Sequence, residues 1–214
     1  MTVAPLPPGS TIGMLGDGQL GRMTALAAAR LGYRTHVFGP EPDSPAAQVT
    51  NRSTLSSYGD REALSRFADA VDVVTYEFEN IPVDTVAFLS ERVPVRPGVA
   101  ALETCQDRLA EKAFVTAQGI EVAPYRPVPT PAALEPALAA IGMPAVLTST
   151  RMGYDGKAQA KIARPADRAA ALRLLGDRPA VLEGFVEFDF ELSVIAARGL
   201  GGVVVCFPPV ENRH

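Results

Sequence analysis

A glycine-rich turn near the start of the sequence has the spacing of a ligand-binding loop. Gly16, Gly18 and Gly21 follow a short apolar run, Thr11 to Leu15, and open an Ala- and Leu-rich stretch, Gln19 to Leu31. A strand–turn–helix of this kind lets the backbone approach a ligand and offers the free N–H groups of a helix N-terminus to an anion. The pattern predicts a nucleotide or phosphate site, or else a first βα turn in which glycine serves only steric needs.

A nicotinamide dinucleotide would require an acidic residue where the second strand ends. The second predicted strand runs from Tyr33 to Phe38, and the first acid after it, Glu41, comes late and precedes Pro42. The sequence therefore favours a different ligand at the same turn.

Acidic side chains follow another predicted strand, Val71 to Tyr76. Glu77, Glu79 and Asn80 come directly after it, and open α/β sheets bind ligands at the carboxyl ends of their strands. The alternative is that these are solvated loop charges. We expect the glycine turn and the 77–80 segment to lie side by side at one edge of the sheet, where together they make a better site than either alone.

Two later segments have the composition of an ATP site. Residues 151–159 place two glycines, an aromatic, an acid and one of only three lysines between two predicted strands. A plain hairpin would need only Asp155-Gly156, whereas a mobile cover over phosphates explains the whole set. Further on, the apolar residues after Glu183 could flank a purine, and Glu191 could accept from ribose hydroxyls. A hairpin with exposed acids is the alternative.

The elements that carry these segments form two units, with the boundary between Pro97 and Gln106. Strands and helices alternate in residues 1–100, which predicts a parallel sheet, whereas residues 101–214 predict an α+β unit with mostly antiparallel order. The residues from Pro124 to Pro131 read as a stiff, extended connection. Further strands are predicted at Val49–Leu55, Val93–Val95, Ala145–Thr148, Ala158–Ala163, Ala180–Phe185, Phe190–Ala197 and Val203–Phe207, and further helices at Arg61–Ala70, Pro82–Leu89, Val99–Glu103, Gln106–Gln118, Ala132–Ile141 and Pro165–Leu175.

The overall composition is that of an ordinary soluble globular protein. The chain has 214 residues, 47% hydrophobic and 21% charged, with a net charge of −4. Its mild acidity argues against a nucleic-acid surface, and no apolar run is long enough for a membrane span. The two cysteines, Cys105 and Cys206, suit a reducing cytoplasm.

Six motifs, taken together, resemble one family. They are GDGQLGRM at 16–23, YEFEN at 76–80, QDR at 106–108, GYDGKAQ at 153–159, EGFVEFDFELS at 183–193 and PPVENRH at 208–214. In this order and spacing the chain resembles the N5-carboxyaminoimidazole ribonucleotide synthetases, which are ATP-grasp enzymes of purine biosynthesis. The resemblance implies an α/β fold: an N-terminal Rossmann-like parallel-sheet domain (pre-ATP-grasp) and then a partial α+β ATP-grasp domain.

The resemblance also implies a reaction. ATP phosphorylates bicarbonate to carboxyphosphate, and the amine of 5-aminoimidazole ribonucleotide captures the CO₂ that this intermediate releases. Asp155 and Lys157 are the implied catalytic residues, with Asp155 handling the amine proton. The implied ribonucleotide and bicarbonate side comprises Gln19, Leu20, Glu77, Tyr154, Asp155 and Lys157. The implied ATP contacts are Arg108, Thr148, Gly153, Tyr154, Asp155, Gly156, Lys157, Ala158, Gln159, Glu183, Gly184, Phe185, Val186, Glu191 and His214.

The sequence departs from the family at three places. Thr148 stands where the family has a lysine, and Ala158 stands where it has a glycine. The family also continues past the position of His214 with the Mg²⁺ ligands, so no metal site is assigned here. We therefore expect no substrate-dependent phosphate release from the 214-residue chain, and a homodimer for the full-length enzyme. An inactive nucleotide-binding fragment or degenerate relative and a small nicotinamide-dependent oxidoreductase remain as alternatives.

Overall fold

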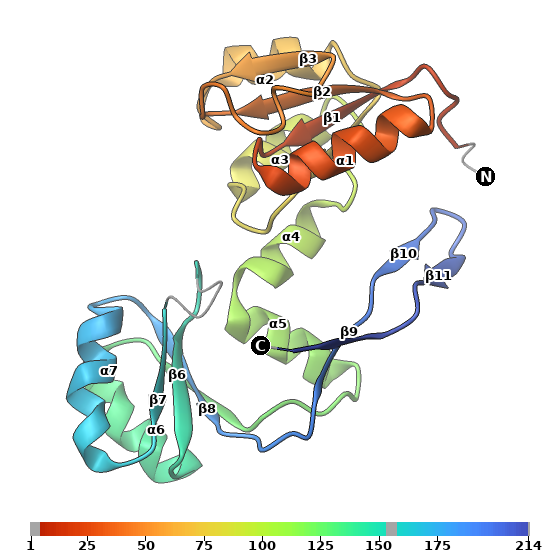
Figure 1. Cartoon of the computed structure of the whole chain (residues 1–214). Helices are drawn as coiled ribbons and strands as arrows, with labels where there is room; N and C mark the ends of the chain where they lie inside the picture. The colour runs from red at the N-terminus through yellow and green to blue at the C-terminus, as the bar shows by residue number, and fades with distance from the viewer. Residues whose placement is uncertain (1–4, 153–157, 214) are drawn as a thin grey trace.

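A four-stranded parallel sheet organises the first part of the chain in the computed structural model, which describes residues 5–152 and 158–213 (Figure 1). The strands lie in the order β3-β2-β1-β4, and every neighbouring pair is parallel. The predicted parallel unit is therefore confirmed. Its strands are β1 (Thr11–Leu15), β2 (Arg34–Gly39), β3 (Arg52–Leu55) and β4 (Val73–Tyr76).

Both faces of this sheet are covered by helices, α1 (Gln19–Arg30) on one side and α2 (Arg61–Ala68) with α3 (Val83–Ser90) on the other. Met14 of β1 packs with Ala25 of α1 on the first side. Leu15, one residue further along, packs on the opposite side with Leu64 and Phe67 of α2. The alternation follows from the two-residue period of a strand, and each large side chain buried in this way contributes about 1.5–3 kcal/mol.

One predicted strand of this unit is wrong. The segment Val93–Val95 forms a single bridge, between Val74 and Val95. Pro94 interrupts it because proline has no N–H to donate to a ladder, and Pro97 follows directly after Arg96. The segment therefore contacts the edge of the sheet without extending it.

Two helices connect the parallel unit to the second sheet (Figure 1). They are α4 (Val99–Gln106) and α5 (Arg108–Ala117). Asp107 separates them, because its backbone is extended and its carboxylate accepts hydrogen bonds from the N–H groups of Leu109 and Ala110. This is the usual N-cap arrangement, and it sets Arg108 at the first position of α5.

The second sheet is antiparallel throughout and has the order β5-β8-β6-β7. Its outer layer consists of α6 (Leu134–Ile141) and α7 (Arg168–Leu175), each preceded by a short 3₁₀ turn at Pro131–Ala133 or Pro165–Asp167. This confirms the mostly antiparallel order expected for the second unit. The strands are β5 (Tyr125–Val128), β6 (Ala145–Ser149), β7 (Gln159–Ile162) and β8 (Ala180–Gly184).

The proline-rich segment from Pro124 to Pro131 contains a strand that the sequence did not predict. Within it, β5 pairs along its length with β8. It lies at the edge of the sheet, which is where a strand tolerates a residue such as Pro127 that cannot donate a ladder hydrogen bond.

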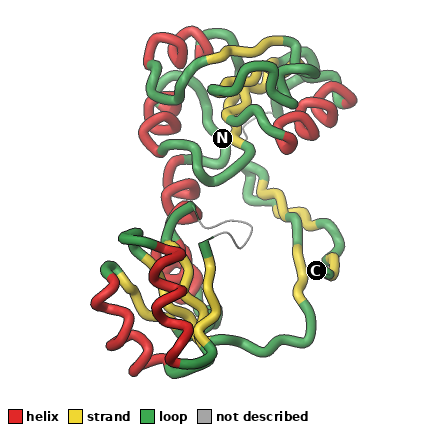
Figure 2. Tube along the Cα trace, turned by 60° about the vertical axis from the view of Figure 1, so that its left-hand side comes forward, coloured by secondary structure: helices red, strands yellow, loops and turns green. Residues whose placement is uncertain are grey.

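The last strands form an arm, residues 191–212, that lies apart from the second sheet in both views (Figures 1 and 2). The predicted strand Phe190–Ala197 is two strands in the structure, β9 (Glu191–Ser193) and β10 (Ala196–Arg198). The former pairs with β12 (Val210–Asn212), which was not predicted, and the latter with β11 (Val204–Cys206). The chain changes partner between β9 and β10, so one continuous strand cannot form. None of the described helices is long and apolar enough to cross a membrane.

Candidate functional site

The glycine turn before α1 holds a carboxylate of the protein itself. The N–H of Gly18 donates to Oε1 of Glu77 at 2.9 Å, and the N–H of Gly21 donates to Oε2. The predicted juxtaposition of the turn with the segment after β4 is thus confirmed. A negative charge at this position is stabilised by the free N–H groups and the dipole of the helix N-terminus.

The glycines are required because Glu77 comes so close. A Cβ at Gly16 would overlap the Glu77 side chain, and one at Gly21 would lie 2.9 Å from Oε2. Gly16 also has a φ of +104°, a region that other residues rarely adopt. Any external phosphate at this helix end would have to displace Glu77, so the turn serves first as an internal clamp.

Asp17 reaches from the glycine turn to the end of β2. Its Oδ2 accepts from the N–H of Glu41 at 3.0 Å, and its carboxylate lies against Gly39 at the end of β2. Burial, together with the negative charges of Asp17 and Glu77, raises the pKa of the Tyr58 phenol well above its usual value. The Glu77 carboxylate occupies the N–H groups that a dinucleotide pyrophosphate would need, which disfavours the dinucleotide interpretation.

The second sheet presents one face that the helices α6 and α7 do not cover. Directly opposed residues of an antiparallel pair point to the same face. Tyr125, Glu183, Val146 and Lys161 form one row across the four strands, and Pro127, Val181, Thr148 and Gln159 form the next. Three of the expected ATP contacts, Thr148, Gln159 and Glu183, therefore share a face.

The charged side chains of this face have partners. Glu183 forms an ion pair with Lys112 of α5, in which both side chains are largely buried. Lys161 lies 3.5 Å from the ring centroid of Phe185. Lys112, Lys161 and Tyr125 were not singled out as site residues from the sequence. The rarity of lysine in this chain is the signal that could have identified the first two.

The segment after β8 is anchored through its backbone. Gly184 donates its N–H to the carbonyl of Pro124 at 2.8 Å, and Phe185 donates to Pro144 at 3.1 Å. The side chains of Phe185 and Val186 remain 37% and 50% exposed. An exposed apolar pair beside a carboxylate suits the flank of a planar, partly polar ligand.

Arg151 lines two cavities of about 340 and 350 Å³ just after β6, and Arg108 lines the first of them. The N–H of Arg108 donates to the carbonyl of Thr150 at 2.9 Å. The guanidinium of Arg151 contacts the Asp107 carboxylate at 3.4 Å and the Gln106 side chain at 3.5 Å. Arg151 had been given no role from the sequence, yet it joins Arg108 in a cleft between α3, α5 and β6.

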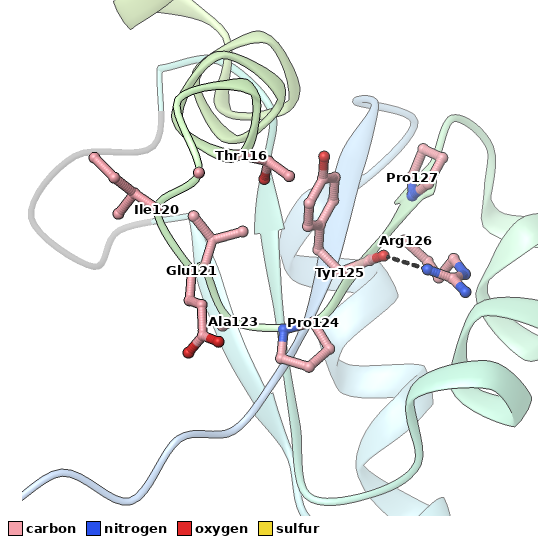
Figure 3. Close-up of a pocket in the computed structure, with 10 residues that line it drawn as sticks. Thr116, Ile120, Glu121, Ala123, Pro124, Tyr125, Arg126 and Pro127 are labelled. Atoms are coloured by element: carbon pink, nitrogen blue, oxygen red, sulfur yellow. Dashed lines mark hydrogen bonds between the residues drawn. The ribbon is translucent and has the colours of Figure 1, made fainter.

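A larger cavity, of about 900 Å³, lies elsewhere, between the end of α5 and β5 (Figure 3). It is lined by Thr116 and residues 119–127. None of the expected site residues that the structure describes lines it. Thr148, Gln159 and Glu183 lie instead on the open face of the second sheet, and Arg108 lines the cleft described above.

The remaining expected residues are distributed as follows. Gln19 and Leu20 are exposed on the first turn of α1. Ala158 is 4% exposed and belongs to the second core, so its methyl group has a packing role. Glu191 lies on the arm and accepts from Asn212 at 2.7 Å. Gly153, Tyr154, Asp155, Gly156, Lys157 and His214 lie outside the described residues. No group of three or more His, Cys, Asp or Glu suited to a metal ion occurs within residues 5–152 and 158–213.

Comparison with known proteins connects both parts of the molecule to one enzyme family. A ribonucleotide synthetase preATP-grasp domain model matches residues 10–106, and an ATP-grasp domain model matches residues 113–214. N5-carboxyaminoimidazole ribonucleotide synthase of Brucella melitensis is 50% identical over 98% of the chain, and that of Pseudomonas aeruginosa is 45% identical over 95%. Over nearly its whole length the chain is therefore similar to the N5-carboxyaminoimidazole ribonucleotide synthetase family.

Solved structures of this family have the same fold. An N5-carboxyaminoimidazole ribonucleotide synthetase in complex with ADP matches all of the chain with a TM-score of 0.95 and 41% identity. The Aspergillus clavatus enzyme, in complex with ADP and 5-aminoimidazole ribonucleotide, matches 97% of it with a TM-score of 0.86 and 30% identity. The predicted fold class, a parallel pre-ATP-grasp sheet followed by part of an ATP-grasp domain, is confirmed. The chain spans 58% and 56% of the length of the Brucella and Pseudomonas relatives.

Proposed function

We propose that this chain binds ATP and 5-aminoimidazole ribonucleotide and takes part in the ATP-dependent carboxylation of that nucleotide with bicarbonate. In this reaction the γ-phosphoryl group of ATP passes to a bicarbonate oxygen, which gives ADP and carboxyphosphate. Carboxyphosphate then breaks its C–O bond to release phosphate and CO₂, and the amine of the nucleotide forms the new N–C bond. The matched relatives carry the name of this synthase, which does not favour the alternative of an inactive relative.

The adenosine end of ATP would lie along the end of β8. Glu183 and the exposed side chains of Phe185 and Val186 would hold adenine, with Gly184 keeping the backbone close. Glu191 would accept from the ribose hydroxyls. The exposed apolar pair next to a carboxylate supports this assignment.

The phosphates would lie toward the end of β6. Thr148 and Gln159 sit opposite one another there, and Arg108 is presented at the N-terminus of α5. The proposed cover over the phosphates comprises Gly153, Tyr154, Asp155, Gly156, Lys157 and Ala158, and His214 would complete the nucleotide pocket. Arginine suits this role because its planar fork can bind two phosphate oxygens at once.

The ribonucleotide would bind near the glycine turn, through Gln19, Leu20 and Glu77. Glu77 is already held by the N–H groups of Gly18 and Gly21, so its carboxylate is pre-oriented. Tyr154, Asp155 and Lys157 would face the ribonucleotide and bicarbonate, with Asp155 taking the amine proton and Lys157 stabilising developing negative charge. Holding the amine near the carbon converts a bimolecular step into a local one.

Further parts of the proposal come from the family. Mg²⁺ would supply charge neutralisation at the phosphates when it is bound, and the full-length enzyme would be a cytoplasmic homodimer. The residues described here offer no clustered ligand set for the metal, so no step is assigned to it. The proposal rests mainly on one observation, that Thr148, Gln159 and Glu183 share the open face of the second sheet.

The test is a set of calorimetric titrations of the 214-residue chain with ADP, 5-aminoimidazole ribonucleotide and NADH. We expect ADP and the ribonucleotide to bind together without competition, and NADH not to bind. Glu191→Gln should weaken only ADP binding, and Gln19→Ala only ribonucleotide binding, so each variant is the control for the other. Binding of NADH in preference to ADP would instead support the oxidoreductase alternative, and absence of ADP binding would refute the proposal.

A further inference from the structure

The open face of the second sheet concentrates a residue type that this chain uses rarely. Lysine occurs only at positions 112, 157 and 161, whereas arginine is common. Lys112 and Lys161 both lie beside the row that carries Glu183. One of them, Lys112, contacts the carboxylate that we propose to face the purine, and the roles assigned above do not account for it.

Lys112 reaches Glu183 from a different element. It lies on α5, one helical turn after Arg108, so the two cations share one side of the helix. Its side chain is 15% exposed and that of Glu183 is 16% exposed, and its Nζ also lies 5.6 Å from the ring centroid of Tyr125. A pair enclosed to this degree restricts the direction in which the carboxylate can point.

The backbone N–H groups next to Glu183 are already used. Those of Gly184 and Phe185 donate to the carbonyls of Pro124 and Pro144. A 6-oxo group of a purine would therefore find no free donor at these two N–H groups, whereas a 6-amino group could donate to the Glu183 carboxylate. A carboxylate in an ion pair only accepts hydrogen bonds.

We propose that Lys112 is a positioning residue that fixes the Glu183 carboxylate as an acceptor for a 6-amino group, and so makes the nucleotide site prefer adenine to 6-oxopurines. This inference rests on the proposed function. The amino group of adenine donates to a carboxylate, whereas the carbonyl oxygen of hypoxanthine or guanine also accepts and is repelled. Sites with directed polar groups discriminate strongly against a ligand that cannot satisfy them.

The experiment compares binding of ADP and inosine diphosphate, which differ at the purine, by calorimetry with the 214-residue chain. We expect the unaltered chain to bind ADP more tightly than inosine diphosphate. Lys112→Met should lower the ratio of the two affinities about tenfold, in line with the loss of one directed polar contact. Lys112→Arg should restore part of the preference because it keeps the charge. Arg173→Met removes an exposed cation on α7 and should leave the ratio unchanged.

A double variant, Lys112→Met with Glu183→Gln, guards against misfolding. It leaves no unpaired charge in the partly buried pair, and we expect it to bind both nucleotides without preference because an amide can donate as well as accept. If Lys112→Met keeps the affinity ratio of the unaltered chain, the inference is overturned. If Lys112→Met does not fold, the same result in the double variant overturns it. Equal affinity for the two nucleotides in the unaltered chain would overturn it as well while leaving the proposed function intact. Failure to bind either nucleotide would refute both.

Discussion

Glu77 shows how one residue can decide the role of a motif. The glycine spacing before α1 is that of a phosphate-binding turn, yet both oxygens of Glu77 accept from its N–H groups. Hydrogen bonds from backbone N–H groups to a charged acceptor are about twice as strong as neutral ones. The N–H groups of the turn are therefore bound by the protein's own Glu77 carboxylate, and the glycines leave space for that side chain.

Replacing Glu77 by glutamine should destabilise the protein. The amide would present its NH₂ group to a backbone N–H, so one donor would lose its acceptor at a cost of about 1–3 kcal/mol. The measurement is urea unfolding followed by circular dichroism. Glu103→Gln, at an exposed position of α4, is the matched control and should change the stability little. Equal stability of Glu77→Gln and the unaltered chain would mean that the carboxylate does not clamp the turn.

Thr148 lies at the proposed phosphate site, where the resemblance described above implies a lysine. It is 2% exposed, so Thr148→Lys must extend past buried neighbours to reach the phosphates. We expect tighter binding of ATP by roughly 1 kcal/mol, because a charge-assisted contact is partly offset by lost side-chain freedom. We also expect a lower melting temperature, from the larger side chain in a packed position.

Adenosine provides the control for that prediction, because it has no phosphates. Calorimetric titration of both proteins with both ligands separates the effects. Equal tightening for adenosine and ATP would show that lysine acts through stability and not through phosphate contact. No change for either ligand, with ATP bound well by the unaltered chain, would show that the arginines suffice.

At the level of elements, the pairing of β2 with β3 includes a buried histidine. Nε2 of His36 lies 2.8 Å from Oγ1 of Thr54, and its ring packs edge-on against Phe67. Burial, and to a lesser degree the positive charge of Arg52, lowers the pKa of His36 from 6.5 to about 4. The folded state therefore resists protonation of His36. Protonation should weaken the pairing of β2 with β3, because His36 contacts Thr54 across it.

This gives a pH dependence with a definite sign. Because the pKa of His36 is lower in the folded state, its contribution to stability is full above pH 6.5 and is lost as the pH falls toward 4. Water screens the part of the pKa shift that the charge of Arg52 causes. We therefore expect the free energy of unfolding to fall by roughly 2 kcal/mol between pH 6.5 and pH 4. The measurement is urea unfolding at a series of pH values. His36→Phe does not titrate and should show a flatter profile; an unchanged slope would assign the effect to other groups.

At the level of the whole molecule, burial is distributed unevenly. The two sheets have their own cores, whereas the arm exposes most of its large apolar side chains. Those that are at least half exposed between positions 188 and 210 are Phe188, Phe190, Leu192, Val194, Ile195, Leu200, Val203, Val204, Val205, Phe207 and Val210. Such a segment gains little from burial and opens at low free-energy cost.

Hydrogen exchange should therefore distinguish the arm from the sheets. We expect backbone amides of β10 and β11 to exchange at least about a hundredfold faster than those of β6 and β8, since the arm opens without breaking either core. Mass spectrometry of peptides from the two regions gives the measurement, and β1 serves as a second protected reference. Protection in the arm equal to that in β8 would contradict the prediction and would mean that its apolar side chains are covered in solution.

The sequence by itself predicted most of the elements and the two kinds of sheet. Short apolar runs that alternate with helical stretches are typical of the strands of a parallel sheet, and this is a local property of the residues. The same holds for the cap at Asp60, where the carboxylate accepts from Ala63 as an N-cap should. Candidate site segments could be proposed in the same way, because the residue types that suggest each of them lie close together along the chain.

The tertiary structure decided the individual contacts of those segments. The sequence predicted that the 77–80 segment lies beside the glycine turn, but not that Glu77, 59 residues from Gly18, accepts from the turn's own N–H groups. Lys112 and Glu183 are also far apart along the chain, and no local pattern predicted their ion pair. The edge strand β5 was hidden by its prolines, since only its position at the margin of the sheet makes them acceptable. Long-range pairing depends on where the chain returns in space, and that is set by the packing of whole elements and not by any one segment.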